Sequence, residues 1–118
     1  EQLTAAMTRA RMCELLSAYL PTVRSDTAFF AGLLSSLDFL LNMPMREVVE
    51  RLPLEDSIAQ ALVDRAGPLG ELLNTVTAYE VADLDALGAS PIELSDLAPA
   101  YLNAIAWSMS VTAEAVSA

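Results

Sequence analysis

The side chains of this chain that are able to do chemistry are unusual in kind. Its 118 residues contain no histidine, no lysine and a single cysteine, Cys13. Ser35 and Ser36 form an adjacent pair of hydroxyls, but a nucleophilic serine or cysteine needs a neighbouring base such as histidine or lysine. We therefore expect no catalytic residue. Cys13 lies on an apolar helical stripe and is expected to be a small buried side chain.

Metal chemistry would have to use the sixteen carboxylates of the chain. Mg²⁺ prefers carboxylate oxygens, so Asp38 with Asp56 or Asp64 is a conceivable site, although Asp38 falls on a different predicted helix from the other two. Two uncharged serine hydroxyls do not hold a divalent ion tightly. The prediction is a chain with no metal and no other cofactor, with the carboxylate site as an alternative.

The net charge of −10 is distributed unevenly. Residues 67–118 contain seven acidic residues and no basic one, so we expect the chain to bind neither nucleic acid nor an anionic membrane surface. Arginines often grip cyclic dinucleotides, and an arginine patch is a second alternative. The arginines all lie in the first 65 residues: Arg9, Arg11, Arg24, Arg46, Arg51 and Arg65.

The spacing of apolar residues is helical throughout, and no stretch alternates as a strand does. The chain is 54% hydrophobic, yet no apolar run approaches the ~20 residues that cross a membrane. The sequence thus predicts one all-α domain over residues 1–118, a bundle of six or seven helices. The expected helices are about 2–20, 26–42, 44–52, 55–65, 68–79 and 96–116, with a short turn at 83–87.

Local signals set the expected helix ends. Asp26 is a plausible N-cap, and Pro44 and Pro68 suit the first positions of their helices. Gly67 is expected to take the left-handed conformation at the end of helix 55–65. Residues 90–93, Ser-Pro-Ile-Glu, have the form of a capping box. Since a lone cysteine builds no disulfide framework, a reducing cytoplasm is the expected compartment.

Five short motifs occur in an order that is more specific than the periodicity. They are Thr-Arg-Ala-Arg-Met-Cys-Glu-Leu-Leu (8–16), Phe-Ala-Gly-Leu-Leu-Ser-Ser-Leu-Asp (30–38), Leu-Pro-Leu-Glu (52–55), Gly-Pro-Leu-Gly-Glu-Leu-Leu (67–73) and Ala-Tyr-Glu (78–80). In this order they resemble the carboxy-terminal part of an HDOD domain, the kind found downstream of an EAL domain in bacterial cyclic-di-GMP signalling proteins. The resemblance covers residues 3–107 and weakens after residue 87.

The resemblance implies an HD-like helical fold in which Ser35 and Ser36 take the place of the His-Asp doublet of metal-dependent HD hydrolases. It also implies missing amino-terminal helices, an upstream EAL domain in a longer chain, and a non-catalytic output module that acts through helix-mediated contacts. The expected partner is another protein or a second copy in a homodimer. Tyr101 and Trp107 are the candidate contact residues because large amphipathic rings often carry interface energy. A small-ligand sensor and a degenerate phosphohydrolase remain the alternatives.

Overall fold

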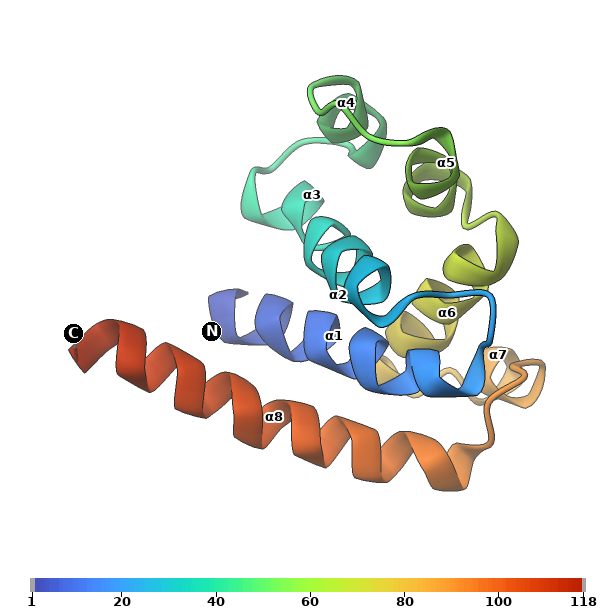
Figure 1. Cartoon of the computed structure of the whole chain (residues 1–118), viewed down its shortest axis with the longest axis vertical. Helices are drawn as coiled ribbons and strands as arrows, with labels where there is room; N and C mark the ends of the chain where they lie inside the picture. The colour runs from blue at the N-terminus through green and yellow to red at the C-terminus, as the bar shows by residue number, and fades with distance from the viewer. Residues whose placement is uncertain (1, 118) are drawn as a thin grey trace.

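The computed structural model describes the backbone of residues 2–117 and the side chains of residues 2–114 (Figure 1). Within these residues the chain is all-α, as predicted, and two of its eight α-helices, α3 and α7, have only four and five residues. The six longer α-helices agree with the predicted bundle. The elements are α1 (Gln2–Leu16), the 3-10 helix η1 (Ser17–Tyr19), α2 (Ser25–Leu34), α3 (Leu37–Leu40), α4 (Met45–Glu50), α5 (Asp56–Asp64), α6 (Gly67–Glu80), α7 (Leu84–Gly88) and α8 (Leu94–Ser117).

Helix α1 is the central element, because α2 packs along one side of it and α8 along the other (Figure 1). Small side chains permit the close approach of α2. A Cβ at Gly32 would lie 2.9 Å from the Cα of Ala10 and 3.0 Å from the Sγ of Cys13. Ala10 and Cys13 are fully buried, so the prediction for the cysteine is confirmed. Leu3, near the start of the same helix, is 53% exposed.

Helix α8 runs antiparallel to α1 and is joined to it by a buried hydrogen bond. The hydroxyls of Thr8 and Ser108 lie 2.7 Å apart, and Ser108 is fully buried. Leu97 and Ala104 are also fully buried, so one face of the helix packs inward over most of its length. Pro99 lies inside α8 as its sixth residue, because the helix begins at Leu94 and not near residue 96.

Four predictions about helix ends are wrong. The expected helix 26–42 is broken into α2 and α3 because the chain turns at residues 35–36, and Asp26 lies in the first turn of α2, after its N-cap. The left-handed residue that ends α5 is Arg65 (φ 55°); Gly67 has the expected positive φ (72°), but it begins α6. The capping box at residues 90–93 does not form, since the Ser90 hydroxyl accepts from the N–H of Ile92 before α8 begins.

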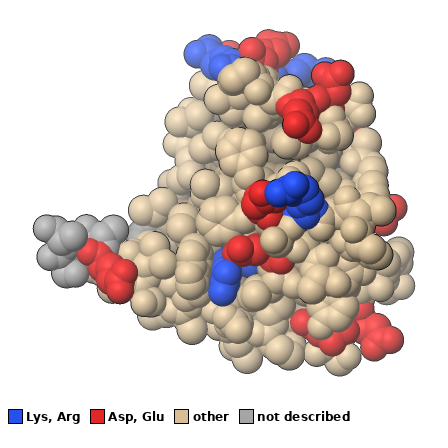
Figure 2. Space-filling view, in the orientation of Figure 1, with Lys and Arg blue, Asp and Glu red and all other residues tan. Residues whose placement is uncertain are grey.

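Charged side chains on the surface are grouped. Figure 2 shows basic side chains lying beside acidic ones on the face it presents, while the acidic side chains near the start of α8 have no basic neighbour there. Glu47 of α4 and Arg51, which follows that helix, form an ion pair at 3.4 Å. No helix in the described part of the chain is both long enough and apolar enough to span a membrane.

Candidate functional site

The serine pair lies in the interior, at the break between α2 and α3. Ser35 is 2% exposed and Ser36 is fully buried. The hydroxyl of Ser35 donates to the carbonyl of Gly32 at 2.7 Å, a local bond that competes with continuation of the helix. Among the residues whose side chains are described, the hydroxyl of Ser36 has no hydrogen-bond partner. The two positions predicted from the resemblance are therefore buried beside α1, and their hydroxyls are not presented to solvent.

Arg9 of α1 joins this break to the end of α6. Its Nη1 donates to both the carbonyl and the hydroxyl of Ser35, each at 3.1 Å. Its Nε and Nη2 donate to the two carboxylate oxygens of Glu80 at 2.9 and 2.7 Å. The guanidinium carbon also lies 5.8 Å from the centre of the Phe39 ring. Such a two-pronged arginine–carboxylate contact fixes both orientation and distance.

Two opposing effects determine the pKa of Arg9. Burial by itself lowers the pKa of Arg9, but the hydrogen bond and the charge of Glu80 outweigh it, so the pKa is raised. Arg65, at the end of α5, is placed differently: burial and then repulsion by Arg9 lower its pKa. Within residues 2–114 its guanidinium makes no hydrogen bond or close ion pair, and its Nη1 is buried. Asp38 contributes a favourable charge to both arginines.

Cys13 lies beneath this group of charges and is unsuited to act as a nucleophile. Burial raises the pKa of its thiol to about 12, although Arg9 and Arg65 act in the opposite direction. A thiol with that pKa is almost entirely protonated near neutral pH, and the reactive form is the thiolate. The sequence prediction of a buried structural cysteine therefore agrees with its environment.

The three carboxylates named for the alternative metal site, those of Asp38, Asp56 and Asp64, do not form one three-residue cluster. Asp56 and Asp64 stand at opposite ends of the nine-residue helix α5, about 12 Å apart along its axis. Asp38 is on α3, near two guanidinium groups whose positive charge opposes a divalent cation. Among the residues whose side chains are described, no three histidine, cysteine, aspartate or glutamate side chains are close enough to hold a metal ion.

Tyr101 and Trp107 are both half-buried against other rings of the same chain. The Tyr101 ring lies 5.3 Å from that of Tyr79, and Trp107 packs edge-on against Phe29 at 5.8 Å. Trp107 also lies 5.3 Å beneath the guanidinium of Arg11. Each ring is thus partly covered by contacts within the chain. A role of Tyr101 and Trp107 in contacting a partner stays a prediction.

The main feature that the sequence did not predict is the Arg9–Glu80 pair. Both residues occur in the motifs that carry the resemblance, but they are separated by 71 positions. With six arginines and sixteen acidic residues, no spacing singles out one pair over the others. The burial of Arg65 Nη1 without a hydrogen-bond partner among the described residues was not predicted from the sequence either.

Comparisons with known proteins show that the chain is similar to a region of two longer bacterial proteins. The cyclic di-GMP phosphodiesterase CdgJ of Vibrio cholerae is 32% identical over 111 residues, which cover 90% of this chain and 26% of that protein. YuxH, an uncharacterized protein of Bacillus subtilis, is 27% identical over 109 residues, which cover 91% of this chain and 27% of YuxH. No family model and no solved structure matches.

The chain therefore spans about a quarter of the length of these curated relatives. It is a distant homologue of one region of a cyclic-di-GMP phosphodiesterase. The similarity extends over 90% of the chain.

Proposed function

We propose that this chain is an HDOD-type, non-catalytic module of a bacterial cyclic-di-GMP signalling protein, acting through helix-mediated contacts with another protein region or a second copy. The observation that carries the proposal is the position of Arg9. In the HD hydrolases that the sequence resembles, the doublet at residues 35–36 would hold a metal. Here a guanidinium is hydrogen-bonded to Ser35 and locked by Glu80.

A positive charge at this position opposes metal binding on chemical grounds. Mg²⁺ and Mn²⁺ need several anionic or strongly basic ligands, and the carboxylate of Glu80 is already paired with Arg9. The buried hydroxyls and the protonated Cys13 thiol offer no activated nucleophile either. Relation to a region of CdgJ supports the signalling context, and the remaining three quarters of that protein leave ample length for catalysis elsewhere.

The non-catalytic part of the proposal is tested by direct turnover. The purified chain is incubated with cyclic di-GMP, and separately with a chromogenic phosphodiester, in the presence of Mn²⁺ or Mg²⁺. We expect no hydrolysis above the rate in buffer. Hydrolysis that is metal-dependent and lost in an Arg9→Met, Glu80→Gln double variant would contradict the proposal, since it would place chemistry at this site.

The contact part is tested by light scattering in line with size exclusion, over a wide range of protein concentration. A mass that rises to twice that of the chain would support self-association through a helical face. Substitutions of Tyr101 and Trp107 by alanine would then test whether those rings lie in the contact. A constant monomeric mass would remove the second copy as a partner and leave contact with another protein region.

A further inference from the structure

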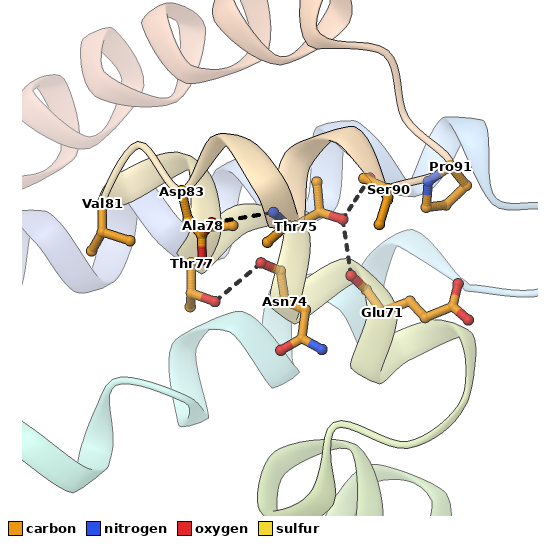
Figure 3. Close-up of a pocket in the computed structure, with 11 residues that line it drawn as sticks. Glu71, Asn74, Thr75, Thr77, Ala78, Val81, Asp83, Ser90 and Pro91 are labelled. Atoms are coloured by element: carbon orange, nitrogen blue, oxygen red, sulfur yellow. Dashed lines mark hydrogen bonds between the residues drawn. The ribbon is translucent and has the colours of Figure 1, made fainter.

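A hollow of about 690 Å³ lies between α6 and α7, on the outer side of α6 (Figure 3). Small side chains, among them Ala78, Ala86 and Ala89, line it. Its walls are held by hydrogen bonds: the hydroxyls of Thr75 and Ser90 lie 2.7 Å apart and tie α6 to the segment after α7. The hollow is therefore a preformed feature that needs no rearrangement to receive a ligand.

Acidic side chains mark the two ends of this hollow. Figure 3 shows Glu71 at one end, and Val81 and Asp83 at the other. Both carboxylates belong to exposed residues and neither forms an ion pair with the described side chains, although Asp83 also caps α7 by accepting from the N–H of Ala86. Because no basic residue occurs in residues 67–118, nothing on these elements neutralises the two acids.

The rim of the hollow near Asp83 also exposes large apolar side chains. Val81 is 74% exposed and Leu84 is 70% exposed, the highest fractions among the exposed large hydrophobic residues. Val81 lines the hollow, and Leu84 begins α7 directly after Asp83. An apolar surface beside acidic side chains without an ion pair suits a segment of complementary chemistry. Such a segment would carry leucine-like side chains together with lysine or arginine.

We propose that the hollow between α6 and α7 is a docking site for a cationic amphipathic helix of a partner protein. The inference rests on the proposed function and specifies its partner class. Glu71 lies on α6, and Val81, at the Asp83 end of the hollow, directly follows the last residue of that helix; the two are ten residues apart, about 15 Å along the axis. A partner helix that lies along α6 would need two basic residues about three turns apart, one near Glu71 and one near Asp83. The apolar residues between them would face Ala78 and Val81.

The probe is a dye-labelled synthetic helical peptide with leucine along one face and lysine along the other, added to the full chain and followed by fluorescence anisotropy. A peptide of the same pattern with glutamate in place of lysine is the control ligand. We expect the lysine peptide to bind, with an affinity that falls as salt is added, and the glutamate peptide not to bind.

Two variants that keep the net charge separate docking from general attraction to an acidic protein. Val81→Ser with Leu84→Ser removes the apolar rim, and Ala86→Phe fills the hollow. Each should weaken binding of the lysine peptide about tenfold. Leu41→Ser is the matched control, because it removes an exposed leucine (53%) outside α6 and α7 and should leave the affinity unchanged. Circular dichroism melting confirms that each variant is folded.

Equal affinity for the wild type and for both variants would overturn the proposal, because the attraction would then depend on charge alone. Absence of binding to the lysine peptide at low salt would overturn it too. If instead the free chain is a dimer and the Val81, Leu84 double variant is a monomer, the surface is a self-contact and the cationic partner is wrong. None of these outcomes depends on catalytic turnover, so a failure here is distinguishable from a failure of the proposed function.

Discussion

Replacement of Arg9 by methionine should destabilise the protein by about 3 kcal/mol. The variant keeps an apolar stem but removes four hydrogen bonds, two to Glu80 and two to Ser35. The Arg9 and Glu80 side chains are 14% and 27% exposed. That exposure places the pair between surface ion pairs, worth about 0.2 to 1 kcal/mol, and buried ones, where loss of one partner costs about 3 to 5 kcal/mol.

Glu80→Gln should cost less, about 1 kcal/mol, because the amide oxygen still accepts one hydrogen bond and water reaches the partly exposed side chain. The double variant should then be less destabilised than the sum of the single variants, with a coupling energy of about 1 to 2 kcal/mol. The assay is urea denaturation of all four proteins, followed by circular dichroism. A coupling below about 0.3 kcal/mol would refute the reasoning, since the two residues would then act independently.

Three further predictions concern packing and protonation. Gly32→Ala should lower stability by about 2 kcal/mol in urea denaturation because a Cβ there meets α1, whereas Gly88→Ala, with open space around it, should cost nothing. Since the pKa of the Cys13 thiol is raised to about 12, against about 8.5 in an unfolded chain, the free energy of unfolding should fall as pH rises above about 8.5, and less steeply in Cys13→Ala. In thermal melts, Thr8→Val and Ser108→Ala should each cost about 1 kcal/mol and show coupling, and strict additivity would argue against their hydrogen bond.

Much of the helical architecture could be predicted because its signals are local. Pro68, for example, lies in the first turn of α6, as expected from its missing N–H and fixed φ. The helices lie close to their expected ranges wherever apolar spacing stops at a proline or a glycine. The break at residues 35–36 escaped prediction because apolar residues continue at helical spacing through Leu41, so the pattern itself carries no sign of the turn.

The contents of the candidate site were only partly predictable. Burial of Cys13 follows from its place on an apolar stripe, which is a local property. The contact of Arg9 with Ser35 and Glu80 joins three segments, and it arises only when α2 and α6 are both packed against α1. Long-range partners of this kind depend on the assembled fold, and one sequence with many acidic residues offers no means of choosing among them.

The antiparallel pairing of α1 and α8 determines how the domain responds to mechanical tension. The start of α1 and the end of α8 lie at the same end of the molecule (Figure 1). Tension applied between these two points would peel the helices apart one turn at a time, because it loads their contacts in sequence and not together in shear. The Thr8–Ser108 bond lies within the turns that separate early. Pulled in this way, the domain would yield at low force and expose the buried face of α8 before the rest of its core opened.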